Sequence, residues 1–286
     1  KVVWADINQR TGCIDPEDVL KKITKKTKAV ICVNWAGIPC DLIALQKICN
    51  KHKIKLIQDA AHAFGTKIKN KSCSNYSDFT CYSFQAIKHI TTGDGGAIVC
   101  KDMRDYERCS KLKWFGMDRE ATKDKKGEWK GQRWKVDVEE AGYKFHMNNI
   151  TASIGLSQIP HADSIISKHK RNGKLYKEAF DNKNYVNLLD VKTEEDPAYW
   201  VYTVLLDEKI NRDKVLEALN RKGVNAGLVH VPNQNYTCFK ESLVELPNTM
   251  YFHKHQISLP CGWWLSENDI IDICKILDET IKEVGY

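Results

Sequence analysis

Short apolar runs alternate with amphipathic stretches along the first 115 residues of the chain. The apolar runs lie at 1–7, 27–35, 54–61, 78–84 and 96–100. The amphipathic stretches lie at 16–23, 41–53 and 103–115. Runs of about five apolar residues are typical of strands, and apolar positions every three to four residues are typical of helices. The alternation predicts an α/β domain whose sheet is mostly parallel and covered by helices on both faces.

The second half of the chain has a different order of patterns. Residues 148–159 and the charged stretch that ends at Ala179 have helical periodicity. A strand pattern follows at 199–206, and further helix patterns follow at 212–223 and 266–284. This mixture is typical of a separate α+β unit.

The length and this change of pattern together predict two domains. A chain of 286 residues is longer than one hydrophobic core usually absorbs. We expect a large domain at residues 1–165 and a smaller α+β domain at residues 166–286. Residues 118–140, rich in Lys, Asp and Gly, predict a long loop. The chain opens directly on an apolar run, so we also expect the N-terminal part of the large domain to be missing from this sequence.

Composition and charge narrow the functional classes only a little. Hydrophobic residues make up 42% of the chain and charged residues 28%, as in ordinary globular proteins. The formal charge is +7, with the densest basic stretches at Lys21 to Lys28 and Lys123 to Lys135. We interpret the excess as a solvated lysine surface, with contact to a nucleotide diphosphate as the alternative. No helix-turn-helix, zinc-finger or RNA-binding motif accompanies it, so we expect no nucleic-acid partner.

Eleven cysteines are scattered along the chain without a C-x-x-C pair. This spacing argues against a zinc site, and the thiols in AVICV and GAIVC are expected to behave as small hydrophobes. We find no signal-peptide pattern and no run of about 18 apolar residues that would span a bilayer. These features predict a protein of the reducing cytoplasm with no membrane partner and no bound metal.

Three residues at predicted strand ends suggest cofactor chemistry. Asp59 follows the run IKLIQ, Ser83 lies at the end of another run, and Lys88 follows in a segment that is neither a good helix nor a good strand. Ligands of open α/β sheets collect at the carboxyl ends of the strands. A pyridinium cofactor requires a carboxylate at its ring nitrogen, a lysine for its aldehyde and donors for its phosphate. The three residues supply one group of each kind.

Each of these residues also has a plainer interpretation. Asp59 is equally well explained as a helix N-cap or a turn aspartate. Lys88 is one of many lysines, and an exposed loop would make it an ordinary surface charge. If the loop is desolvated, the pKa of the Lys88 amine falls and the amine becomes a nucleophile. Spacing by itself leaves both interpretations open.

Four long segments carry a family resemblance. They span residues 5–65, which end in DAAHAFG, residues 82–99, which contain SFQAIKHITTGDGG, and residues 142–159 and 246–260. In this order they resemble the sugar-nucleotide aminotransferases of the DegT/DnrJ/EryC1/StrS family over nearly the whole chain. The resemblance implies the fold-type I architecture of aspartate aminotransferase, pyridoxal 5'-phosphate as cofactor, and a homodimer with active sites at the subunit interface.

The resemblance also implies roles for single residues. Lys88 forms the Schiff base with the cofactor and shuttles protons, Asp59 pairs with the pyridine nitrogen, and Ser83 binds the phosphate. His62, in DAAHA, lies beside the cofactor ring and its hydroxyl. The deoxysugar dehydratases that resemble these enzymes carry histidine at the lysine position. Lys88, followed here by His89, therefore favours transamination.

The reaction that the resemblance implies has two substrates. An amino acid, L-glutamate by family habit, gives its amino group to a keto-deoxysugar linked to a nucleotide diphosphate. The product is an amino sugar for a surface polysaccharide or glycoconjugate. Two alternatives remain open, a cofactor-dependent sugar dehydratase on the same fold and a family member that has lost turnover.

Further site residues follow from weaker parts of the resemblance. The segment GYKFHMNN matches a stretch that reaches into the partner's active site, where an asparagine contacts the phosphate. That asparagine corresponds to Lys144 or to His146, and Asn148 and Asn149 follow nearby. Either a lysine or a histidine in its place would still donate to a phosphate.

Substrate contacts and the start of the chain are the least defined features. The turn with His230 and Asn233 falls where relatives approach the sugar, and we also expect His89 to contact the substrate. The basic side chains of the loop from Trp129 to Lys135 suggest a cover for the diphosphate. A plain surface turn is an equally good interpretation of both segments. Family members also have an upstream turn that cradles the phosphate and an aromatic residue that stacks on the ring. We therefore expect roughly a hundred residues to be missing.

Overall fold

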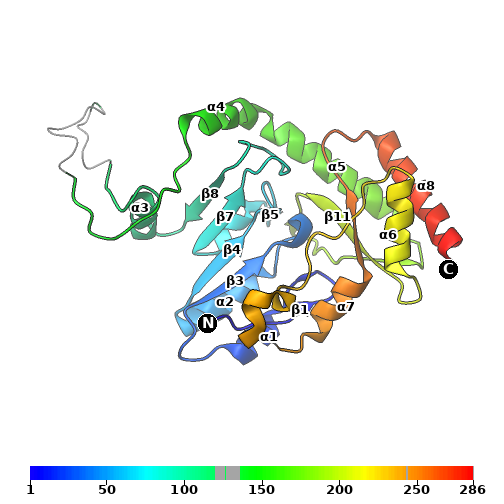
Figure 1. Ribbon diagram of the computed structural model, residues 1–286, viewed down its shortest axis with the longest axis horizontal. Helices are drawn as coiled ribbons and strands as arrows, with labels where there is room; N and C mark the ends of the chain where they lie inside the picture. The colour runs from blue at the N-terminus through cyan, green and yellow to red at the C-terminus, as the bar shows by residue number, and fades with distance from the viewer. Residues whose placement is uncertain (120–125, 127–135, 243, 286) are drawn as a thin grey trace.

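A four-stranded sheet forms the centre of the N-terminal half (Figure 1). The computed structural model describes residues 1–119, 126, 136–242 and 244–285. The strand order is β3-β4-β7-β8, with β8 antiparallel and the other three parallel. The strands are β3 (Ala29–Val33), β4 (Lys55–Asp59), β7 (Phe79–Ser83) and β8 (Gly96–Cys100). The prediction of a mostly parallel sheet is confirmed.

Short elements connect and flank these strands. They are β1 (Ile7–Asn8), β2 (Cys13–Ile14), α1 (Pro16–Lys22), η1 (Trp35–Gly37), α2 (Leu42–His52), β5 (Lys67–Ile68), β6 (Lys71–Ser72) and η2 (Cys73–Tyr76). Asp15 caps α1 and Asp41 caps α2, each by accepting a backbone N–H of the first turn. The strand expected at residues 1–7 is wrong for residues 1–6, because only Ile7 and Asn8 pair with β2.

Only one face of the four-stranded sheet is covered in the described part of the chain. Val30 and Leu56 are buried on one face, where they share a core with α2. On the opposite face Ile31, Val33 and Ile98 are exposed. The crossover helix α2 and the segment from β5 to η2 both pack on the first face, and α3 leads away from the sheet. The expectation of helices on both faces is therefore wrong for the described residues.

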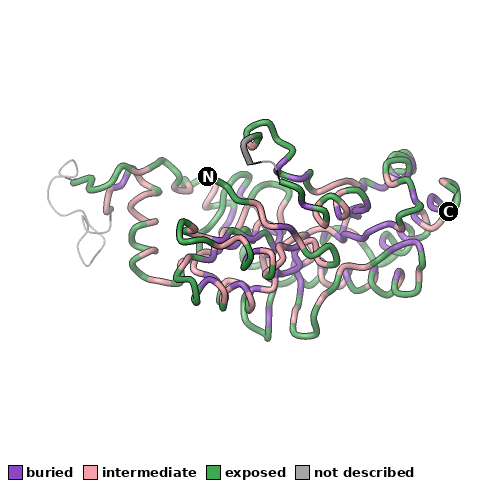
Figure 2. Tube along the Cα trace, turned by 90° about the horizontal axis from the view of Figure 1, so that it is seen from below, coloured by how far each residue is buried: buried purple, intermediate pink, exposed green. Residues whose placement is uncertain are grey.

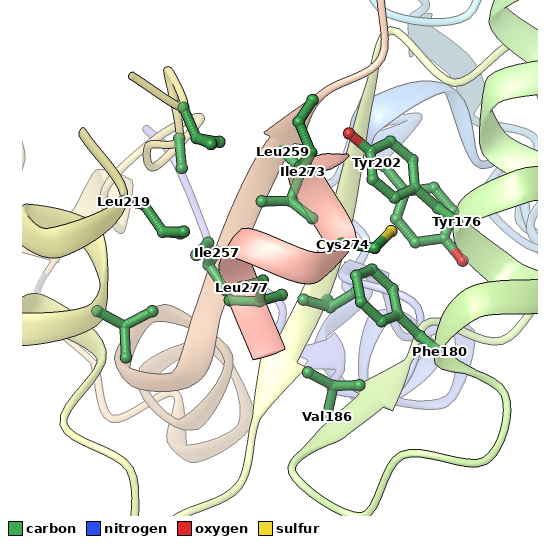
Figure 3. Packing of buried hydrophobic residues seen from close by; sticks show 14 of the residues in the cluster. Tyr176, Phe180, Val186, Tyr202, Leu219, Ile257, Leu259, Ile273, Cys274 and Leu277 are labelled. Atoms are coloured by element: carbon green, nitrogen blue, oxygen red, sulfur yellow. The ribbon is translucent and has the colours of Figure 1, made fainter. Parts of the chain in front are cut away.

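The C-terminal half builds its own core around the sheet β12-β11-β9, in which both pairings are antiparallel. Its elements are α5 (Ala162–Phe180), β9 (Val186–Leu188), β10 (Glu195–Asp196), β11 (Val201–Leu206), α6 (Arg212–Arg221), η4 (Asn233–Asn235), η5 (Thr237–Ser242), α7 (Pro247–His255), β12 (Gln256–Pro260) and α8 (Glu267–Val284). Figure 3 shows apolar side chains of this half packed together. The domain boundary expected at residue 165 stays a prediction, and it falls within α5.

An arm extends from the sheet and returns to α5 (Figure 1). It contains α3 (Met103–Leu112), α4 (Asn149–Gln158) and η3 (Ile159–His161). No side chain of α3 is buried, and Figure 2 shows the arm mainly exposed or intermediate. Within the described ranges, no helix has the length and apolar character needed to cross a membrane. The basic stretch from Lys123 to Lys135 lies, except for Lys126, outside the described residues.

Asp6 ties the start of the chain to α7. Its carboxylate accepts hydrogen bonds from the backbone N–H groups of Asn248 and Thr249, at 3.0 and 2.9 Å, and from the Thr249 hydroxyl at 2.7 Å. Backbone donors at a helix N-terminus lack partners within the helix, and a carboxylate satisfies them and balances their partial positive charge. Asp6 is only 7% exposed, so water has little access to replace it.

We predict that Asp6→Ala lowers the free energy of unfolding by about 2–3 kcal/mol, because it leaves the helix donors unpaired. Urea unfolding followed by circular dichroism measures this change. Asp272→Ala, which removes an exposed carboxylate from α8, is the matched control and should change the free energy by less than about 0.5 kcal/mol. Equal losses in the two variants would contradict the capping role of Asp6.

Candidate functional site

The carboxyl ends of β4 and β7 form an open hollow of about 330 Å³. Asp59 and Ser83 lie in its lining, together with the apolar side chains of Ile31 and Ile57. Asp59 pairs with Cys81 in the sheet register, and Ser83 lies two residues further along β7. Since alternate residues of a strand point to the same face, both side chains lie on the uncovered face of the sheet. The hollow has the volume of a small ligand site.

Lys88 lies in the segment between β7 and β8, where its side chain is partly buried. Burial lowers the pKa of its amine below the ordinary value, and the charge of Asp59 partly opposes this change. Its Nζ lies 3.8 Å from the centre of the Trp200 ring. A lysine with a lowered pKa carries more of the neutral amine that attacks a carbonyl carbon.

His62 is buried in a stack of rings beside this lysine. Its imidazole lies 4.1 Å from the Trp200 ring at an angle of 17°, and 5.9 Å from the His230 ring at 11°. Burial, reinforced by the charge of Lys88, lowers the pKa of His62 to about 2. The ring is therefore neutral at physiological pH. Its buried Nδ1 has no hydrogen-bond partner among the described residues.

His230 lies at the same site, although a long stretch of sequence separates it from the other site residues. Partial burial lowers the pKa of its ring, the charge of Lys88 lowers it further, and the charge of Asp59 raises it. The 5.9 Å separation of the His230 and His62 rings places His230 at the site. The structure thus brings together Lys88, Asp59, His62 and His230.

Residues 198–200, here called the strap, are hydrogen-bonded to the segments that carry the site residues. The backbone N–H of Trp200 donates to the carbonyl of Ala36 at 2.9 Å, and the Ala198 N–H donates to the Thr66 hydroxyl at 3.1 Å. The Trp200 indole Nε1 donates to the carbonyl of Ile87 at 2.7 Å. The strap therefore contacts the segments that follow β3, β4 and β7. Sequence reasoning missed Trp200, since no spacing links DPAYW to a lysine more than a hundred residues earlier.

His89 points into the protein and not toward the hollow. It is 2% exposed, and its Nε2 lies 3.0 Å from the carbonyl of Ala198. Its ring lies 4.6 Å from that of His169, whose Nδ1 lies 2.9 Å from the carbonyl of Tyr199. A carbonyl only accepts, so each of these ring nitrogens carries the proton. His89 and His169 thus anchor the Lys88 segment and α5 to the strap.

Other residues named from the sequence lie apart from this constellation. Lys144 and His146 pack on Trp114 of the arm, with the Lys144 Nζ 5.3 Å and the His146 ring 4.0 Å from the Trp114 ring. Asn148 caps α4, whose first residue is Asn149. Asn233 is exposed at the start of η4. The loop from Trp129 to Lys135 lies outside the described residues.

The residues at the hollow fit a pyridoxal phosphate. The exposed Asp59 carboxylate suits a ring nitrogen, the Ser83 hydroxyl suits a phosphate, and Ile31 and Ile57 supply apolar surface for a flat ring. The partly buried amine of Lys88 supplies a further polar group at this site. No cluster of three or more potential metal ligands occurs among the residues that the structure describes.

Comparisons with known proteins agree with this geometry. The model of the DegT/DnrJ/EryC1/StrS aminotransferase family matches residues 1–278. GDP-perosamine synthase of Escherichia coli O157:H7 is 30% identical over 280 residues, which cover 97% of this chain and 72% of that protein. The structure of Helicobacter pylori PseC, an aminotransferase involved in the biosynthesis of pseudoaminic acid, matches with a TM-score of 0.89 and 27% identity, covering 98% of this chain and 74% of that one.

The fold and the site define a pyridoxal-phosphate-dependent aminotransferase of fold type I. The chain belongs to the DegT/DnrJ/EryC1/StrS aminotransferase family. A protein of Methanocaldococcus jannaschii without an assigned function is likewise 30% identical over 290 residues, covering 99% of this chain and 74% of that protein. The expected family, fold class and cofactor are therefore confirmed.

The buried histidines predict that the protein loses stability in weak acid. Burial lowers the pKa of His62 to about 2 and that of His89 to about 3, whereas the unfolded chain protonates both near the ordinary value of 6.5. Below that pH the unfolded state binds more protons than the folded state. Stability is therefore complete above pH 6.5 and falls below it, by about 2 kcal/mol per histidine between roughly pH 7 and pH 5.

Urea unfolding of the cofactor-free protein at these two pH values measures the loss. His89→Gln, which keeps a donor for the carbonyl of Ala198, should reduce the drop by about 2 kcal/mol. His52→Gln, at an exposed position of α2, is the control and should leave the drop unchanged. A drop of the same size in the His89 variant would contradict this assignment.

Proposed function

We propose that this aminotransferase transfers an amino group from an amino acid, L-glutamate in the first instance, to a keto-deoxysugar linked to a nucleotide diphosphate. The observation that carries the proposal is the convergence of Lys88, Asp59, Ser83 and His62 at one edge of one sheet. The relatives support the substrate class, since GDP-perosamine synthase and an altrosamine transaminase of Helicobacter pylori are named for amino sugars. The amino sugar would serve a surface polysaccharide or glycoconjugate.

The bound cofactor supplies an electron-withdrawing ring that stabilises negative charge developing at the substrate carbon. Asp59 would keep a proton on the ring nitrogen, because a carboxylate at hydrogen-bond distance favours the protonated form. The Ser83 hydroxyl would donate to the phosphate, and His62 would lie beside the cofactor ring. The Lys88 amine would bond to the cofactor's aldehyde carbon and, once released, would move a proton at the reacting carbon.

We further propose that the active enzyme is a homodimer. The arm supports this proposal, because it exposes large apolar side chains that a monomer would leave in water. Phe145 is 75% exposed, Ile150 is 77% exposed and Leu156 is 71% exposed. In such a dimer Lys144 and His146 of the arm would reach the partner's phosphate site. A cytoplasmic location completes the proposal, and the eleven free cysteines are compatible with it.

Lys88→Ala should abolish both cofactor attachment and turnover, since its amine is the group that would bond to the cofactor. The visible absorbance of the protein with pyridoxal phosphate reports attachment. Formation of 2-oxoglutarate from L-glutamate, with a panel of 3-keto and 4-keto sugar nucleotides, reports turnover. Lys101→Ala, which removes an exposed lysine just after β8, should leave both unchanged.

Two results would contradict the proposed reaction. One is the loss of oxygen from the sugar without consumption of glutamate, which would indicate the dehydratase. The other is an absence of the absorbance band in the unaltered protein, which would indicate a family member without this chemistry.

Ile150→Glu should weaken the dimer by about ten-fold or more, because it places a charge in an apolar contact. Sedimentation equilibrium over a range of concentrations measures the dissociation constant. Ile271→Glu, at an exposed position of α8, is the matched control and should leave the constant unchanged. A protein that sediments as a monomer at every concentration would exclude the proposed dimer.

A further inference from the structure

The side chain of Trp200 makes three separate contacts with the site. The Nζ of Lys88 lies 3.8 Å from the centre of its ring. Its ring stacks on that of His62 at 4.1 Å and 17°. Its Nε1 donates a hydrogen bond of 2.7 Å to the carbonyl of Ile87, the residue before Lys88. One side chain from the C-terminal half thus contacts the backbone, the amine and the neighbouring ring of the lysine segment.

The contact with Lys88 is attractive and needs no hydrogen-bond acceptor. The face of an indole carries partial negative charge, and an ammonium within about 6 Å of its centre is stabilised, most strongly where water is excluded. The influence of Asp59 on Lys88 is a charge attraction across space. A direct pair with a carboxylate would hold the amine firmly in its charged form. The indole instead holds the amine weakly and leaves it free to react.

The hydrogen bond to Ile87 fixes where the ring lies. A lysine side chain has four rotatable bonds and loses about 2 kcal/mol of conformational free energy when it is fixed in one position. The hydrogen bond to the carbonyl of Ile87 attaches the ring to the backbone next to Lys88, within reach of its amine.

We propose that Trp200 is a positioning residue that holds the protonated amine of Lys88 on its ring, at the edge of the hollow, while that amine is not bonded to the cofactor. This inference rests on the proposed role of Lys88. It adds the position of the Lys88 amine while that amine is not bonded to the cofactor. Trp200 itself takes no part in bond formation or proton transfer.

Two kinds of variant distinguish the effect of the Trp200 ring on Lys88 from the effect of its hydrogen bond to Ile87. Trp200→Phe keeps an aromatic face and removes the donor to Ile87. Trp200→Leu and Trp200→Met remove both and keep apolar bulk, so at least one ringless variant should be available if the other unfolds. Trp263→Leu removes an exposed tryptophan outside the site and serves as the control.

The measurement is competitive acetylation of the full chain without cofactor, by acetic anhydride over a range of pH. Peptide mass spectrometry reads the labelling of Lys88 against exposed Lys101. The pH dependence gives the pKa of the Lys88 amine, and the plateau at high pH gives its accessibility. The ringless variants should carry about five-fold more neutral amine at a pH below the pKa, because the stabilisation of the ammonium is lost. Trp200→Phe and Trp263→Leu should stay within about two-fold of the unaltered protein.

Each outcome supports or overturns one of the two proposals. A shift shared by the Phe and the ringless variants would assign the effect to the hydrogen bond and overturn the role of the ring. An unchanged or raised pKa in the ringless variants would also overturn it. If the pKa of Lys88 falls only in the ringless variants but the unaltered protein produces no 2-oxoglutarate, the proposed function is wrong. The proposed position of the amine on the Trp200 ring is then still supported. If the protein transaminates but Lys88 is labelled equally in the ringless variants and the unaltered protein, only the proposed role of Trp200 is wrong.

Discussion

The site depends on the hydrogen bonds of one short strap, residues 198–200. These bonds join a segment of the C-terminal half to the residues that follow β3, β4 and β7. The fit is close enough to need unusual backbone conformations, since Ala36 and Tyr199 both have positive φ angles, 55° and 45°. A side chain on Gly37 would lie 2.6 Å from the backbone nitrogen of Tyr199. The strain at these positions is offset only while the two halves stay in contact.

The strap also determines the electrostatics of the site. By covering His62 and His89 it excludes water from both rings and keeps them neutral. The neutral rings leave Lys88 and Asp59 as the charged pair at the described part of the site. The consequence of burying these two histidines is a protein that is less stable in acid.

The sheet contributes a different constraint. Alternation along β4 and β7 places Asp59 and Ser83 on the face that carries the exposed side chains of Ile31 and Ile98. The opposite face is occupied by the core that α2 covers. A flat apolar ligand with polar ends therefore has one face of the sheet available to it. The hollow lies there, and the acid and the hydroxyl approach it from neighbouring strands.

The sequence alone indicated the four strands of the central sheet and the helices α1, α2 and α3, because the periods of apolar residues follow directly from strand and helix geometry. It also indicated Asp59, Ser83 and Lys88, since residues at the ends of parallel strands share one edge. The resemblance had suggested His230 as a substrate contact, and only the tertiary structure decided that Trp200 joins the site and that His89 turns inward. Those positions depend on contacts between residues far apart in the chain, which no local pattern encodes. The tertiary structure also determined which face of the sheet is uncovered, because α2 and the segment from β5 to η2 pack on the other face.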